Sequence, residues 1–71
     1  MNPRYLAYCR AHGMASDKMM EADEAAYPGG PMAGYSVWIS AQYSVFRRLF
    51  RKVGNFSKED YEKFDRWLAA K

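Results

Sequence analysis

The longest regular pattern in the sequence is an apolar face that repeats at helical spacing between residues 35 and 53. Its members are Tyr35, Trp38, Ile39, Gln42 (the one polar exception), Val45, Phe46, Leu49, Phe50 and Val53. A face this broad is typical of a helix that lies on a hydrophobic core. We therefore predict one long helix from about Met32 to Val53, ended by Gly54.

Two shorter helices are predicted before the long one. Asn2 is placed to cap the first of them, a proline follows at the first helical position, and Gly13 is a C-terminal stop. Ser16 is placed to cap the second. This helix should end at or just before Tyr27, because a residue that precedes a proline disfavours helical geometry.

The last helix has the clearest start in the chain. Ser57 is the predicted N-cap, and Asp60 three residues later completes a motif that resembles a capping box. Phe56 and Tyr61 are placed on either side of the cap as a hydrophobic staple. The buried stripe of this helix is predicted to be Tyr61, Phe64, Trp67 and Leu68.

These patterns predict an all-α fold, a compact array of about four short helices in one domain that covers residues 1–71. A chain of this length buries only about 60% of its unfolded surface, and its single cysteine excludes a disulfide framework. Dense aromatic packing and self-association can supply the missing stability, and we expect a homodimer at micromolar concentration. The predicted core consists of Trp38, Phe46, Leu49, Phe64 and Leu68.

The turn before the long helix reads Pro28-Gly29-Gly30-Pro31. Glycine-rich turns before helices often bind phosphate through backbone N–H groups, with a lysine close behind. Here the prolines remove two donors, and the next lysine is Lys52. We therefore interpret the segment as a structural turn in which one of the glycines has positive φ.

Candidate chemistry elsewhere is sparse. Cys9 and His12 are spaced like a nucleophile and its base, but no third group accompanies them, and we interpret them as core neighbours. We predict no enzyme activity, no metal and no cofactor. The acidic residues of the second helix lack the order of a calcium loop and should form a solvated face. They are Asp17, Glu21, Asp23 and Glu24.

The sharpest charge signal is the segment from Arg47 to Lys52, in which four cations flank a leucine and a phenylalanine. It suits phosphate backbones and stacked bases, an anionic membrane surface or an acidic protein groove. A plain helix C-terminus, where cations face the helix dipole favourably, explains two of the four charges. Both interpretations stay open. If one helix carries all four cations, Arg47 lies one turn from Arg51 and Arg48 lies one turn from Lys52, so that they form two short basic edges.

Serines recur at every fourth position of the long helix, at residues 36, 40 and 44. They indicate either a solvated face or a close crossing with another helix or another chain. Together with the basic segment they give the predicted partner-binding residues, which are Ser40, Ser44, Arg47, Arg48, Arg51 and Lys52.

The stretches NPRYLAYCRAHG and AYPGGPMAGYSVWI, with a short acidic helix between them, resemble a family of small proteins of bacteriophages and prophages. The resemblance covers roughly residues 2–42 and implies a phage origin. Small accessory phage proteins commonly bind and inhibit host machinery, including defence complexes. The resemblance therefore implies a non-enzymatic protein that binds a host protein or nucleoprotein complex and can inhibit it.

A nucleic-acid-binding protein and a structural or assembly protein of the virion are the alternatives. We favour a protein partner, because a net charge of +3 is low for a dedicated nucleic-acid binder and the acidic helix would repel phosphates. No apolar run approaches the roughly 18 residues of a membrane span, and the first residues lack the apolar core of a signal peptide. The expected location is the host cytoplasm, without a membrane partner.

Overall fold

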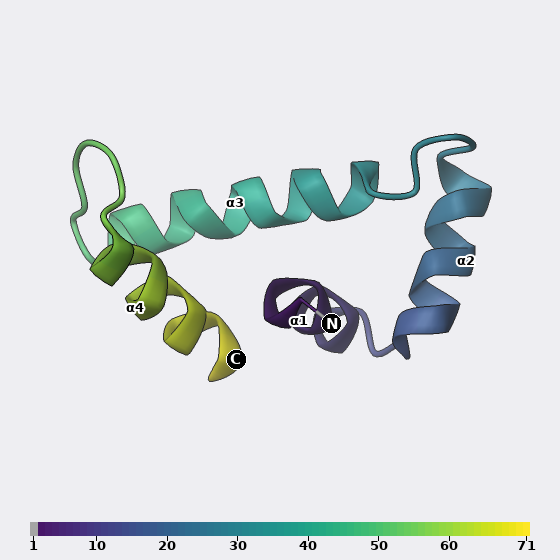
Figure 1. Cartoon of the computed structure of the whole chain (residues 1–71), viewed down its shortest axis with the longest axis horizontal. Helices are drawn as coiled ribbons and strands as arrows, with labels where there is room; N and C mark the ends of the chain where they lie inside the picture. Colours follow the sequence, from purple (N-terminus) through teal and green to yellow (C-terminus); the bar gives the residue numbers. More distant parts are fainter. Residues whose placement is uncertain (1) are drawn as a thin grey trace.

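The structure, a computed structural model, describes residues 2–71 and contains four α-helices in that range. These are α1 (Pro3–Ala11), α2 (Ser16–Ala26), α3 (Ala33–Leu49) and α4 (Lys58–Ala69). Figure 1 shows α2, α3 and α4 as three sides of an open arch, with α1 seen nearly end-on inside it. The helix α1 contacts each of the other three. The predicted all-α fold is confirmed.

Both predicted ends of α1 are confirmed. The side chain of Asn2 accepts the backbone N–H of Arg4 at 2.8 Å. At the other end Gly13 has φ +65°, and the N–H of Met14 donates to the carbonyl of Cys9 at 3.0 Å. This is the six-residue hydrogen bond of a Schellman motif, in which glycine takes the left-handed position.

The helix α2 begins differently from the prediction. Its N-cap is Ala15, whose carbonyl accepts the N–H of Met19 at 2.8 Å. Ser16 is already helical, so its side chain makes no capping bond. The predicted serine cap is therefore wrong, because the chain enters the helix one residue earlier than the serine pattern indicated.

The turn between α2 and α3 agrees with the structural interpretation of its sequence. The N–H of Gly30 donates to the carbonyl of Tyr27 at 2.8 Å, and Gly29 has φ +79°. Proline at the second position and positive φ at the third are the features of a type II turn. The predicted positive φ is confirmed at Gly29.

The helix α3 ends at Leu49, four residues before the predicted end. Arg51 has φ +53°, and the N–H of Lys52 closes the helix on the carbonyl of Arg47 at 2.9 Å. Arg51 thus occupies the left-handed position that glycine usually takes. The early end lets the chain return, so that the ring of Phe56 lies 5.6 Å from that of Phe46. The predicted pair of basic edges on one helix is therefore wrong.

The start of α4 is as predicted. The hydroxyl of Ser57 accepts the N–H of Asp60 at 3.2 Å, and the Asp60 carboxylate accepts the N–H of Ser57 at 2.8 Å. The rings of Phe56 and Tyr61 lie 5.2 Å apart, as a hydrophobic staple requires. The cap and the staple together fix the direction in which the chain enters α4.

The core has two parts that meet at Trp38. One is built on Tyr5, Tyr8, Cys9 and Met19, and the other on Ala7, Phe46, Phe64 and Leu68. The predicted burial of Phe46, Phe64 and Leu68 is confirmed. Trp38 is only half-buried. The prediction that Leu49 belongs to the core is wrong, since 63% of its surface is exposed. The nine-residue α1 is too short to cover the whole of α3, so the end of α3 stays open.

The acidic face of α2 is not wholly solvated, which corrects a further prediction. Asp23 is 4% exposed and is the one buried charged residue in the range 2–71. Its two carboxylate oxygens accept the hydroxyl of Tyr8 at 3.1 and 3.0 Å. Gly34 packs directly above this pair, since a Cβ at that position would lie 2.8 Å from the Tyr8 hydroxyl oxygen.

Candidate functional site

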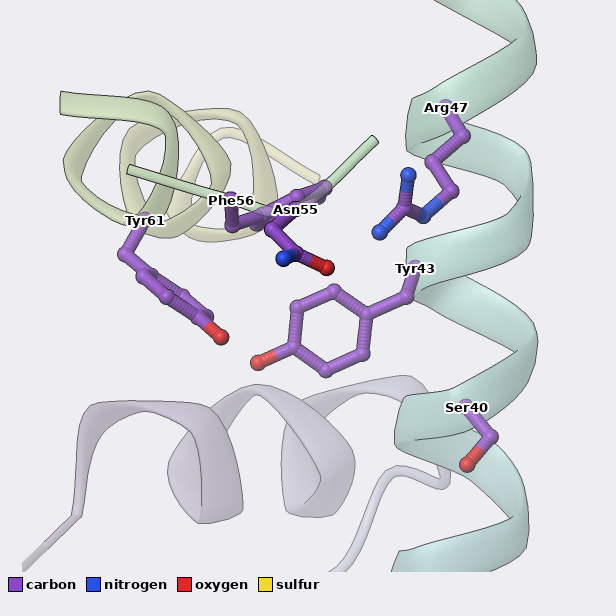
Figure 2. A pocket seen from close by; sticks show the side chains of 6 residues that line it. All are labelled: Ser40, Tyr43, Arg47, Asn55, Phe56 and Tyr61. Atoms are coloured by element: carbon purple, nitrogen blue, oxygen red, sulfur yellow. The ribbon is translucent and has the colours of Figure 1, made fainter. Parts of the chain in front are cut away.

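An open hollow of about 420 Å³ lies where α3, the loop after it and α4 meet. The helix α3 contributes Ser40, Tyr43 and Arg47, the loop contributes Asn55 and Phe56, and α4 contributes Tyr61. Figure 2 shows the polar ends of Tyr43, Tyr61, Asn55 and Arg47 turned toward one shared space. We call these six residues the α3–α4 hollow.

Arg47 is held firmly at the wall of the α3–α4 hollow. Its Nη1 donates to the carbonyl of Gly54 at 2.8 Å, and its guanidinium carbon lies 4.6 Å from the centre of the Phe56 ring. No acidic side chain of residues 2–71 pairs with it. A guanidinium carries five N–H donors, so most of them remain available to a ligand.

Tyr43 forms the aromatic floor of the hollow. One face of its ring stacks on Phe64 at 4.2 Å with an interplanar angle of 16°. The rings of Phe56 and Tyr61 meet it edge-on at 5.5 and 6.4 Å. Burial raises the pKa of Tyr43 above its ordinary value, so the hydroxyl stays protonated at neutral pH and can donate a hydrogen bond.

The structure separates the four cations that the sequence placed together. Only Arg47 lines the α3–α4 hollow. Lys52 forms an ion pair with Asp60 at 3.0 Å, in which both side chains are about three-quarters covered. Arg48 and Arg51 are exposed, and no acid of the described chain pairs with them. The four cations therefore lie in three different environments and do not form one basic surface.

Apolar side chains are exposed beside Arg48 and Arg51. The exposed fractions are 63% for Leu49, 46% for Phe50 and 87% for Val53. We call these five residues the basic–apolar corner. The sequence pattern placed these three apolar residues on the core-facing side of the long helix, and Leu49 in the predicted core, because their spacing continues the helical face beyond the point where the helix ends.

The serine strip is solvated. Ser36, Ser40 and Ser44 are all exposed, and Ser44 bonds within its own helix to the carbonyl of Ser40 at 3.3 Å. Ser40 nevertheless reaches the rim of the α3–α4 hollow, which connects one of the predicted serines with Arg47.

The interpretation of Cys9 and His12 as core neighbours is right for Cys9 and wrong for His12. Cys9 is buried, and burial raises the pKa of its thiol, which disfavours the nucleophilic thiolate. His12 is exposed, and its Nδ1 lies 2.9 Å from the Tyr8 carbonyl oxygen. Residues 2–71 also hold no cluster of three or more His, Cys, Asp or Glu side chains suited to a metal ion.

Four members of the α3–α4 hollow were not predicted as site residues from the sequence, namely Tyr43, Asn55, Phe56 and Tyr61. Tyr43 stands one helical turn before Arg47, and this spacing was the available signal. Among the helices of residues 2–71, none has the length and hydropathy of a membrane span. No protein-family model, curated protein or solved structure matches the chain, so the geometry of the site carries the functional argument.

Proposed function

We propose that the protein is a non-enzymatic binding protein that docks on another protein through the basic–apolar corner. The carrying observation is the exposure of Leu49, Phe50 and Val53 beside two arginines that no acid pairs with. Arginine and aromatic side chains are enriched in protein interfaces, and apolar patches rimmed by polar groups mark such sites. A partner would cover the apolar side chains and supply acids to the arginines.

The backbone of Arg51 supports the same proposal. A left-handed conformation costs a residue with a Cβ roughly 1–2 kcal/mol, and Arg51 adopts it at φ +53°. The same position at the end of α1 is Gly13, which adopts this conformation without that cost. Strained residues cluster at functional sites, so the arginine side chain is expected to have a use that offsets the strain.

The proposed partner is a host protein, or the protein part of a host nucleoprotein complex, which the binding inhibits. The resemblance to small phage proteins supports a host target. The charge distribution supports protein over nucleic acid, because Lys52 is already paired with Asp60 and few cations remain for a phosphate backbone, whose binding strength rises with each contact.

Affinity purification from a bacterial lysate, with and without nuclease, tests the proposal. The bait is the full chain, as wild type, as the corner variant R48Q/R51Q and as the control R10Q/K18Q. The control loses two exposed cations from α1 and α2, so both variants have the same net charge. A second corner variant, L49S/V53S, tests the apolar part.

We expect a protein that the wild type and the control both retain after nuclease treatment and that both corner variants lose. Circular dichroism melting establishes that each variant is folded. Retention of the partner by both corner variants would contradict the proposal. Loss of all binding on nuclease treatment would favour the nucleic-acid alternative.

A further inference from the structure

We propose that the α3–α4 hollow is the anchor pocket in which the partner protein places an acidic side chain, with Arg47 as the ligand of its carboxylate. This inference rests on the proposed function, since it names the chemistry that the partner must present. The hollow adjoins the basic–apolar corner, because Arg47 in its wall donates to the carbonyl of Gly54, the residue that directly follows Val53 of the corner. A partner that covers Val53 is therefore next to the hollow.

The charges around the hollow favour an incoming anion. Among residues 2–71 no acid lines the hollow. On α4, Asp60 is bonded to Ser57 and paired with Lys52, and Asp65 is paired with Arg4 at 2.7 Å. The guanidinium of Arg4 also lies 5.5 Å from the centre of the Tyr61 ring. An entering carboxylate would therefore meet a cation at the wall and no acid among the lining side chains.

Arg47 is prepared for this contact before the partner arrives. A long cationic side chain normally loses conformational freedom when it binds. The Phe56 ring and the Gly54 carbonyl already restrict Arg47. Its planar fork matches the two oxygens of a carboxylate. The restriction lowers the entropic cost of binding, and the fork selects carboxylate over a neutral amide.

The other lining groups fit the rest of an acidic segment. Figure 2 shows the hydroxyls of Tyr43 and Tyr61 and the amide of Asn55 in the same space as the guanidinium. Tyrosine, serine, asparagine and arginine are the residues that antibody combining sites use to hold protein segments. A nucleotide fits less well, because its phosphate would meet one guanidinium in a hollow with no second lining cation.

The test is a ¹H–¹⁵N NMR titration of the full chain with three probes. These are acetyl-Phe-Asp-Phe-amide, its neutral isostere acetyl-Phe-Asn-Phe-amide, and adenosine monophosphate. We expect the aspartate peptide to shift the amides of residues 43, 47, 54–56 and 61 in a saturable way, with a Kd on the order of 1 mM for so small a ligand. The asparagine peptide should bind about tenfold more weakly or worse.

Matched variants assign the effect to Arg47. The variant R47Q should lose about tenfold or more in affinity for the aspartate peptide, whereas R10Q removes an exposed charge of α1 outside the hollow and should bind like the wild type. If R47Q does not give a native-like spectrum, the pair Y43F and Y61F replaces it. These variants keep the rings and remove the hydroxyls, and each should weaken binding several-fold.

Equal affinity for the two peptides, unchanged binding by R47Q, or no saturable shift up to about 10 mM would overturn the proposal. Tighter binding of adenosine monophosphate than of the aspartate peptide would overturn it in favour of a nucleotide site. The titration needs no cellular partner. A failed titration therefore leaves docking through the basic–apolar corner intact, and a failed purification leaves the peptide result standing.

Discussion

The hydroxyl of Tyr8 donates to both carboxylate oxygens of Asp23, at 3.1 and 3.0 Å, and both residues are less than 5% exposed. This contact joins α1 to α2 across fifteen residues of sequence. Burial, followed by the bond to Asp23, raises the pKa of Tyr8 to about 12, so the phenol keeps its proton over the physiological range. The pair is the polar centre of a part of the core that is otherwise apolar and aromatic.

The substitution Tyr8→Phe should destabilise the fold by about 1.5–3 kcal/mol. It removes the donor and leaves the buried carboxylate without a partner, which costs more than an ordinary hydrogen bond. Urea unfolding followed by circular dichroism measures the effect. The control is Tyr27→Phe, at a tyrosine that is 46% exposed, and it should change stability little. Equal stability of the two variants would show that the pair does not stabilise the fold.

The substitution Gly34→Ala should destabilise the protein, although alanine ordinarily stabilises a helix interior by about 1 kcal/mol over glycine. The added methyl would lie 2.8 Å from the Tyr8 hydroxyl and 3.3 Å from an Asp23 oxygen, and overpacking typically costs about 1–3 kcal/mol. The double variant with Tyr8→Phe, in which the obstructing oxygen is absent, should recover part of the loss. A higher melting temperature for Gly34→Ala alone would refute the close approach.

Asp60 should make stability depend on pH in the acid range. The Ser57 N–H, followed by Lys52, lowers the pKa of Asp60 to about 2. Because the folded pKa lies below the unfolded one, the stabilisation is present above about pH 4 and is lost as the pH falls toward 2. Asp60→Asn should therefore melt below the wild type at pH 7, and the difference should shrink at pH 2.5.

The control for Asp60 is Glu59→Gln, which removes a charge from the same first turn without breaking the capping box. Its melting temperature should follow that of the wild type closely across the same pH range. A difference between Asp60→Asn and the wild type that stayed constant from pH 7 to 2.5 would exclude the carboxylate as its source.

Features that depend on neighbouring residues were predictable from the sequence. The cap at Asn2, the glycine end of α1, the turn at Gly29 and the capping box at Ser57 each rest on side chains a few positions apart, and all are present. The end of α3 was not predictable in this way, because its left-handed residue is Arg51, and the local signal for such a position is glycine.

Features that depend on contacts between distant segments could not be predicted from sequence patterns. The burial of Asp23 depends on a tyrosine from another helix, whereas four acids gathered in one helix by themselves indicate a solvated face. The α3–α4 hollow forms because Phe56 and Tyr61 return to the side of Tyr43 and Arg47. The basic segment was visible, but the pairing of Lys52 with Asp60 required the folded loop.

Phe46 and Leu49 test which part of the helical face is core. Phe46 is 1% exposed and touches the rings of Phe56, Phe64 and Trp67, so Phe46→Ala should cost about 3–5 kcal/mol and largely unfold so small a domain. Leu49→Ala should cost less than about 0.5 kcal/mol, since it lies away from the core. Thermal melts of the two variants measure the difference. A similar loss of stability in both variants would show that Leu49 belongs to the core.

The substitution Arg51→Gly should raise stability by about 0.5–1 kcal/mol. Relief of the left-handed strain gives roughly 1–2 kcal/mol, and the greater freedom of glycine in the unfolded chain offsets about half of it. The matched variant Arg48→Gly removes the same charge from within α3, where glycine costs about 1 kcal/mol, so the two melting temperatures should move in opposite directions. In the purification assay Arg51→Gly should nonetheless bind the partner less well than the wild type, because the side chain that offsets the strain is gone. A destabilised Arg51→Gly would contradict the strain, and a stabilised variant with full binding would remove Arg51 from the interface.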